Sequence, residues 1–358
     1  GARRKGGLMA ALDGVDLEMA QTQRIKKLAD VIVTDVADLY KMGVELGRGR
    51  FSVVKSAVHR VEGESYAVKE VMNETLHDEE NLEALETEIN ILRQLRHPHI
   101  VALKEVVATS TYTYIVMELL SGGELFNRIV EKGSFPETEA KPLFAQIILS
   151  MDYLHGLNIV HRDVKPENIL YITEGGVDIK LIDFGYAGVW AADKQLTGLC
   201  GTPDYVAPEV LTWYEDEENG TEYGKGSDLW SLGVLLYVIL SGCSPFCGDD
   251  EEELLKLVSQ AKYVFYENEW QGISNEAKDL IRKLLVVDPL QRLTMAEVIA
   301  HPWLSESVAK CRAVMAEKQK TMSMSSNGAR PAATTAAPQR ARSPSNGEVR
   351  TGCTCVIV

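Results

Sequence analysis

The hydrophobic pattern of the chain changes once, at Gly122-Gly123, and this change constrains the fold more than any other feature of the sequence. Before it, 51–58 and 64–71 are rich in β-branched and aromatic residues, which predicts neighbouring strands. Between those strands and the change, apolar residues over 82–95 recur at the spacing of an amphipathic helix. Beyond the change this helical spacing dominates. The later helices are expected at 143–154, 227–241, 251–260, 274–286 and 294–300.

This pattern predicts an α+β fold with a small sheet-rich lobe over 40–120 and a larger helical lobe over 121–304. Residues 1–39 form an N-terminal extension with a helix expected near 16–29. Residues 305–358 are expected to be a flexible basic tail, because small and polar residues cannot bury enough surface to offset the entropy of ordering.

Charge is distributed unevenly along the 358 residues. The chain carries 37 Lys plus Arg against 52 Asp plus Glu, a net charge of −15. Residues 305–358 hold 8 basic and 3 acidic residues, a net of +5, which leaves −20 for 1–304. An acidic body argues against nucleic acid as a partner. The six cysteines lack C-x-x-C spacing, so we expect no zinc site, no disulfide framework and a cytoplasmic location.

The segment Gly47-Arg-Gly49-Arg-Phe-Ser52-Val-Val54 lies between two strand-like runs. Its glycines permit a tight turn whose backbone amides can close over phosphates, and Val54 offers an apolar face to a nucleobase. Taken alone, the segment fits a glycine-containing hairpin turn equally well, because short glycine patterns are weak indicators. Ser52 stands in place of a third glycine, so the match to a phosphate-binding loop is incomplete.

Two opposite charges fall on positions that should be buried. Lys69 ends the apolar strand segment Tyr66-Ala-Val-Lys, and Glu88 lies on the apolar stripe of the 82–95 helix. An unpaired buried charge costs several kcal/mol, so we expect Lys69 and Glu88 to pair. The other glutamates of this helix are expected to be solvated.

Oxygen-bearing side chains then cluster after the long helix, in His161-Arg-Asp163-Val-Lys165-Pro-Glu-Asn168 and at Asp183-Phe-Gly. Asn168 and Asp183, delivered from adjacent loops, are ligands that Mg²⁺ accepts. Asp163 can take the proton of an attacking hydroxyl while Lys165 neutralises charge on the transferred group. A single Asp in such a loop is more often a turn cap, but the four residues together favour phosphoryl transfer.

In order and spacing these motifs, together with Ala207-Pro-Glu209, resemble the signature set of the eukaryotic protein kinases over about residues 40–304. The resemblance implies the bilobal kinase fold, ATP and Mg²⁺ as cofactors, Met117 as gatekeeper, Asp228 as orienter of the catalytic loop, and an Arg292–Glu209 pair. It also implies nucleotide contacts at Leu46, Gly47, Gly49, Ser52, Val54, Ala67, Lys69, Met117, Glu118, Leu120, Glu124 and Leu170.

The motif Lys165-Pro-Glu167-Asn168 and the segment 201–205 resemble serine/threonine kinases, and His301-Pro-Trp303 is similar to the calcium/calmodulin-dependent group. The long segment between Glu209 and Asp228 and the loop Asp183-Phe-Gly-Tyr186 resemble the phosphorylase kinase catalytic subunit. In relatives that prefer basic substrates, acidic residues at the positions of Glu124 and Glu167 bind an arginine upstream of the target hydroxyl. We therefore expect basic protein substrates of the type Arg-x-x-Ser/Thr. Thr202 matches the family's substrate-facing threonine.

Two regulatory features are expected from the resemblance. Arg162 matches an arginine that binds an activation-loop phosphate in many kinases. The usual phosphothreonine position is Gly198 here, and Thr197 sits one residue early. Calmodulin binding needs a basic amphipathic helix after the kinase domain. Residues 305–320 carry apolar residues at helical spacing and four basic residues, but a short terminal helix without calmodulin binding explains them more simply.

The sequence closes on Cys353-Thr-Cys355-Val-Ile-Val358, which fits a C-a-a-X prenylation box at Cys355. Because one lipid holds weakly, Cys353 is a palmitoylation candidate that would strengthen attachment to a membrane surface. The competing function for the whole chain is a pseudokinase scaffold that binds partners without chemistry. Its usual mark is loss of Lys69, Asp163 or Asp183, and all three residues are present.

Overall fold

The sheet of the N-terminal lobe has six strands in the order β1-β5-β6-β4-β3-β2. The structure is a computed structural model that describes residues 25, 30–49, 52–191, 195–215 and 220–325. All but one of the neighbouring strand pairs are antiparallel. The strands are β1 (Val31–Val33), β2 (Tyr40–Arg48), β3 (Ser52–His59), β4 (Ser65–Met72), β5 (Leu103–Ala108) and β6 (Tyr112–Glu118).

One strand comes from outside the predicted kinase domain. β1 pairs in parallel with β5, and the short helix α2 (Val36–Leu39) links it to β2. Ile25, 1% exposed, packs into the same core as α3 (Glu79–Gln94). The extension therefore contributes to this lobe, although most of the helix predicted near 16–29 lies outside the described residues.

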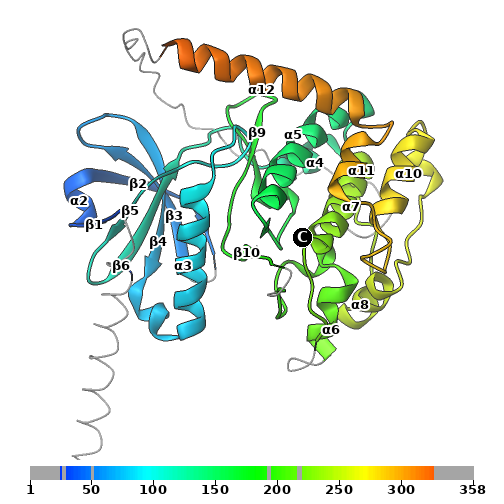
Figure 1. Cartoon of the computed structure of the whole chain (residues 1–358), viewed down its shortest axis with the longest axis horizontal. Coiled ribbons are helices and arrows are strands. Elements are labelled where there is room, and N and C mark those ends of the chain that lie inside the picture. The colour runs from blue at the N-terminus through cyan, green and yellow to red at the C-terminus, as the bar shows by residue number, and fades with distance from the viewer. Residues whose placement is uncertain (1–24, 26–29, 50–51, 192–194, 216–219, 326–358) are drawn as a thin grey trace, which may run out of the picture.

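Helix α3 lies beside this sheet (Figure 1) and confirms the predicted amphipathic pattern. Leu82, Leu85, Ile89 and Leu92 are buried, and Asp78 caps the helix by accepting a hydrogen bond from the amide of Glu80. A side-chain acceptor at this position satisfies one of the free amides of the first turn. A 3-10 turn at Asn73–His77 connects β4 to the helix.

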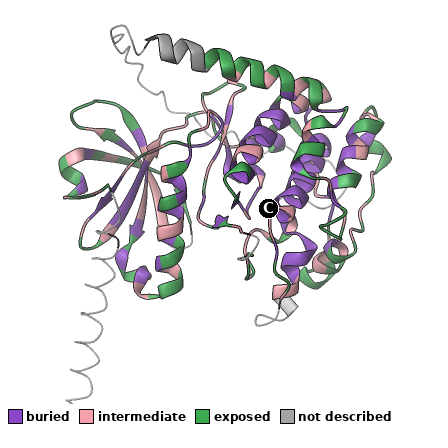
Figure 2. Ribbon diagram, viewed as in Figure 1, coloured by how far each residue is buried: buried purple, intermediate pink, exposed green. Residues whose placement is uncertain are grey.

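The C-terminal lobe is helical and is centred on α7 (Gly226–Ser241), in which every residue from Ser227 to Ser241 is buried. Figure 2 shows this helix and its neighbour α5 (Glu137–Gly156) as the buried centre of the lobe. The predicted helices are present within a few residues of their expected ends. They are α5, α7, α8 (Glu251–Ser259), α10 (Asn275–Leu284) and α11 (Met295–Ala300). The shorter helices α4 (Leu125–Lys132), α6 (Pro208–Glu215) and α9 (Glu267–Trp270) were not predicted.

Two small two-stranded sheets lie at the side of this lobe that carries the catalytic motifs. β7 (Ile159–Val160) pairs with β10 (Gly188–Val189), and β8 (Ile169–Tyr171) pairs with β9 (Ile179–Leu181), both antiparallel. They fix the ends of the loops that carry Asp163 and Asp183. Among the described residues, the structure shows no helix that is both long and apolar enough to cross a membrane.

A last helix, α12 (Ser305–Ser325), is formed by the first residues of the region in which a flexible tail was expected. It packs along α5 (Figure 1). Val308 is buried, and Cys311 Sγ lies 3.7 Å from His99 Nε2 in the loop after α3. Lys318 Nζ forms an ion pair with Asp178 at 2.7 Å. A helix therefore forms over 305–325, where a flexible tail was expected, and Val308, Cys311 and Met315 pack against the core of the kinase domain.

Candidate active site

Lys69 is held between two carboxylates. Its Nζ lies 2.7 Å from Glu88 Oε1 on α3 and 3.3 Å from Asp183 Oδ1. Burial alone would lower the pKa of Lys69, but the two carboxylates raise it above its ordinary value. The same lysine lowers the pKa of Asp183. The ion pair expected between Lys69 and Glu88 is present, and it fixes α3 against β4.

Asp228, at the start of α7, holds the backbone of the catalytic loop. Its carboxylate accepts hydrogen bonds from the amides of His161 (3.0 Å) and Arg162 (2.9 Å). His155 Nε2 lies 2.8 Å from the same carboxylate. Burial would raise the pKa of Asp228, but the interactions with His155 and the amides keep it below its usual value. Arg162 has φ of +67°, and this uncommon conformation is stabilised by these contacts.

The side chain of Asp163 is buried and fully engaged. Its Oδ1 accepts a hydrogen bond from the Thr202 hydroxyl at 2.9 Å, and its Oδ2 accepts one from Asn168 Nδ2 at 2.8 Å. Lys165 Nζ lies 3.0 Å from Asp163 Oδ2 and donates to Thr202 Oγ1 at 2.6 Å. These contacts bring together four of the predicted site residues: Asp163, Lys165, Asn168 and Thr202.

The donor set for a metal ion also fits the prediction. Asn168 donates through Nδ2 to the Asp163 side chain and backbone, which leaves its amide oxygen to face a cation. Asp183 has φ of +57° and also accepts a hydrogen bond from the Gly185 amide. An amide oxygen and one carboxylate suit Mg²⁺, which takes its remaining ligands from phosphate and water. The described part of the chain holds no group of three or more His, Cys, Asp and Glu side chains placed for a metal.

Eight of the twelve predicted nucleotide residues lie on the neighbouring strands β2, β3, β4 and β6 of the N-terminal sheet. Val54 on β3 pairs with Gly47 on β2 and with Lys69 on β4. Ala67 on β4 pairs with Met117 on β6. The turn between β2 and β3 is closed by a hydrogen bond from the Gly49 amide to the Ser52 carbonyl at 2.9 Å, and Leu46 lies on β2 before it.

Glu118 has a structural role that the sequence did not predict. The carboxylate of Glu118 accepts a hydrogen bond from the Ala102 amide at 2.7 Å and pairs with Lys180 on β9. It therefore ties the segment between the lobes to β9. Gly122 lies four positions after Glu118, and a Cβ there would be 2.5 Å from Tyr171 Cβ. Only glycine therefore allows this segment to approach β8, the strand that carries Leu170. No sequence motif marks the Lys180 contact.

The two acids predicted to read a substrate arginine are close enough to influence each other. Glu124 precedes α4, and Glu167 lies in the 3-10 turn Pro166–Asn168. Burial raises the pKa of both carboxyls, and Glu124 adds to the shift of Glu167. Within the described residues, the buried Glu167 Oε2 accepts no hydrogen bond.

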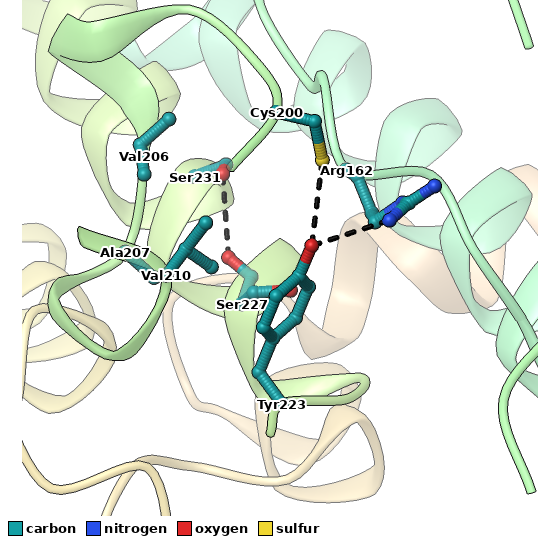
Figure 3. Close-up of a pocket in the computed structure, with 8 residues that line it drawn as sticks. All are labelled: Arg162, Cys200, Val206, Ala207, Val210, Tyr223, Ser227 and Ser231. Carbon is teal, nitrogen blue, oxygen red and sulfur yellow. Dashed lines mark hydrogen bonds between the residues drawn. The ribbon is translucent and has the colours of Figure 1, made fainter. Parts of the chain in front are cut away.

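We call the segment between Asp183 and Glu209 the activation segment. Among its described residues, which exclude 192–194, Arg162 meets no charged acceptor. Its Nη1 donates to the Tyr223 hydroxyl at 3.2 Å and to the Thr197 carbonyl at 3.4 Å. Figure 3 shows these side chains around a small pocket. The contact of Tyr223 was not predicted, because this residue lies 61 positions after Arg162 and belongs to none of the catalytic motifs.

Cys353 and Cys355 lie outside the described residues, so their lipidation stays a prediction.

Comparison with known proteins agrees with this geometry. The protein kinase domain model matches residues 40–304. Myosin light chain kinase A of Dictyostelium discoideum is 42% identical over 297 residues, covering 81% of this chain and 98% of the relative. Calcium/calmodulin-dependent protein kinase type 1B of Rattus norvegicus is 40% identical over 282 residues, covering 78% of this chain and 79% of the relative.

Proposed function

This chain belongs to the protein kinase family, as a serine/threonine kinase of the calcium/calmodulin-dependent group, and we propose that its substrates carry an arginine upstream of the phosphorylated hydroxyl. The family uses ATP and Mg²⁺, which together supply the γ-phosphoryl group and neutralise charge on it. In this proposal Asp163 orients the substrate hydroxyl and accepts its proton, and Lys165 balances the charge that develops nearby. Lys69 binds phosphate, and Asn168 with Asp183 binds the metal.

The single observation that supports the arginine preference is the orphaned oxygen of Glu167. A buried carboxylate oxygen without a donor costs free energy, and the neighbouring Glu124 adds repulsion. A guanidinium offers several N–H donors and a positive charge, so it satisfies both carboxylates at once. A neutral side chain would leave the repulsion in place.

We expect Glu167→Gln to remove most of the arginine preference. The wild-type kinase should phosphorylate a peptide with arginine three residues before serine with kcat/KM at least about tenfold above the alanine analogue, since hydrogen bonds to charged groups contribute about 1.5–3 kcal/mol. Glu167→Gln should lower kcat/KM for the arginine peptide about tenfold and leave the alanine peptide nearly unchanged. Steady-state kinetics on the two peptides measures this.

The matched control is Glu131→Gln, which removes the same charge from an exposed position of α4. This control should keep the arginine preference. Equal turnover of the arginine, alanine and acidic peptides by the wild-type kinase would contradict the proposal.

Calmodulin control is a further proposal, supported by the names of the relatives and by the helical form of α12. Its apolar anchors Val308, Cys311 and Met315 pack against the core of the kinase domain, so calmodulin could bind them only after α12 leaves α5. Calcium-dependent retention of the full chain on immobilised calmodulin is the expected result. Equal recovery with calcium and with a chelator would contradict it.

A further inference from the structure

In the part of the activation segment that the structure describes, neutral groups contact Arg162. The guanidinium donates to the carbonyls of Tyr186 and Thr197 and to the Tyr223 hydroxyl. In a kinase that depends on activation-loop phosphorylation, a phosphate would supply the acceptor for such an arginine. The position where that phosphate is expected, Gly198, has φ of +81° and carries no side chain.

Tyr223 connects this arginine to the activation segment. The tyrosine is 3% exposed, and its hydroxyl lies 2.9 Å from the Gly198 carbonyl and 3.4 Å from Cys200 Sγ. The hydroxyl has one proton, which the nearer Gly198 carbonyl accepts, and its lone pair accepts from Arg162. In Figure 3 the hydroxyl points between Cys200 and Arg162. Burial raises the pKa of Tyr223, so it remains a neutral donor.

The backbone of Tyr223 adds a second attachment. Its amide donates to the Leu196 carbonyl at 3.0 Å, and the Leu196 amide donates to the Tyr223 carbonyl at 3.0 Å. Residues 196–200 are therefore attached at both backbone and side chain to the segment that leads into α7. Because α7 is buried along almost its whole length, this attachment point is rigid.

The residues that follow 196–200 lie beside the catalytic loop and contact Asp163. Gly201, with φ of +95°, lies so close to the Arg162 carbonyl that a Cβ there would be 2.6 Å from its oxygen. The next residue, Thr202, donates its hydroxyl to Asp163 Oδ1 at 2.9 Å. Only three residues separate Gly198, whose carbonyl Tyr223 binds, from Thr202, so a displacement of one end moves the other.

We propose that Tyr223 is a positioning residue that holds the activation segment in its substrate-binding conformation without a phosphate on that segment. The Tyr223 hydroxyl takes the place of the phosphate as the acceptor for Arg162, and its contact with Gly198 sets the position of Thr202 beside Asp163. The kinase is then competent for phosphotransfer as an unmodified chain. This inference rests on the kinase activity but not on the proposed arginine preference.

The test begins with the full chain treated with a phosphatase and shown by mass spectrometry to carry no phosphate. We expect it to retain its initial rate on a serine peptide within about twofold. Tyr223→Phe should raise the peptide KM about tenfold, because the Gly198 carbonyl loses its donor and Arg162 loses one of its acceptors. The KM for ATP should stay within about twofold, since the lysine pair and the metal ligands are untouched.

Tyr237→Phe is the matched control. It also removes a hydroxyl from a buried tyrosine of the same lobe, where it donates to the Val264 carbonyl at 2.6 Å, but it does not touch the activation segment. Its peptide KM should stay within about twofold of wild type. Hydrogen exchange over 195–202 should accelerate in Tyr223→Phe and not in Tyr237→Phe.

Two results would overturn the proposal. One is a dephosphorylated chain that is inactive until Thr197 is phosphorylated, which would assign Arg162 to a phosphate. The other is a Tyr223→Phe variant that is indistinguishable from Tyr237→Phe in peptide KM and in hydrogen exchange over 195–202.

Discussion

We expect the Asp163→Asn variant to lose about 10²- to 10⁴-fold in kcat while the KM for ATP changes less than about threefold. The asparagine has the same size, but it cannot accept the proton of the substrate hydroxyl. It also presents an amide to Thr202, Asn168 and Lys165, all of which donate to or pair with the carboxylate in the wild-type chain. The measurement is steady-state kinetics with ATP and peptide varied separately.

Asp152→Asn provides the control for this variant. It removes one carboxylate charge from α5 at a partly exposed position, where Asp152 pairs with Arg312 at 3.4 Å. Its kcat should be within about twofold of wild type, because exposed ion pairs contribute little. An Asp163→Asn variant that keeps more than a tenth of the wild-type kcat would show that another group accepts the proton.

We expect Arg292→Met to lower the free energy of unfolding by about 3–5 kcal/mol, the usual cost of leaving one member of a buried ion pair without its partner. The Arg292 side chain is 0% exposed and forms two hydrogen bonds to Glu209, at 2.9 and 3.0 Å. It also donates to the carbonyl of Val286 at 2.9 and 3.0 Å. Without it, the buried Glu209 carboxylate and the Val286 carbonyl lose their donors. Urea unfolding followed by tryptophan fluorescence measures the loss.

Two further variants make this expectation specific. The double variant Arg292→Met with Glu209→Leu should recover part of the loss, because no unpaired buried charge remains. Lys283→Ala, which breaks an exposed pair with Asp279 of 2.7 Å, should cost less than about 1 kcal/mol. An Arg292→Met loss no larger than that of Lys283→Ala would contradict the account of the buried pair.

Those parts of the fold that depend on local pattern were predictable from the sequence. The apolar stripe of α3 predicted both the helix and the burial of Glu88, and burial of a charge predicted its pairing with Lys69. Asp163 and Asn168 belong to one short motif, so their closeness was also predictable, and the Asn168 amide donates to the Asp163 carboxylate at 2.8 Å. In each case the physical constraint acts within a short stretch or on an isolated charge.

The features that the sequence did not predict depend on contacts between distant segments. Tyr223 acts through Arg162 and Gly198, and neither a periodicity nor a charge marks it. The strand β1 is only three residues long and is stabilised by the edge of β5. A flexible tail was expected from residue 305, but Val308, Cys311 and Met315 of α12 pack against the core of the kinase domain. Likeness to the phosphorylase kinase catalytic subunit stays a prediction.

The central claim is that this chain transfers phosphate from ATP to serine and threonine through the site around Asp163. The most direct measurement is transfer of label from γ-labelled ATP with Mg²⁺ to a basic peptide, followed by analysis of the labelled amino acid, with Lys69→Met and Asp163→Asn as blanks. The account predicts phosphoserine or phosphothreonine with the wild-type chain and almost none with either variant. Equal labelling by the wild type and the two variants, or no labelling by any of them, would contradict it.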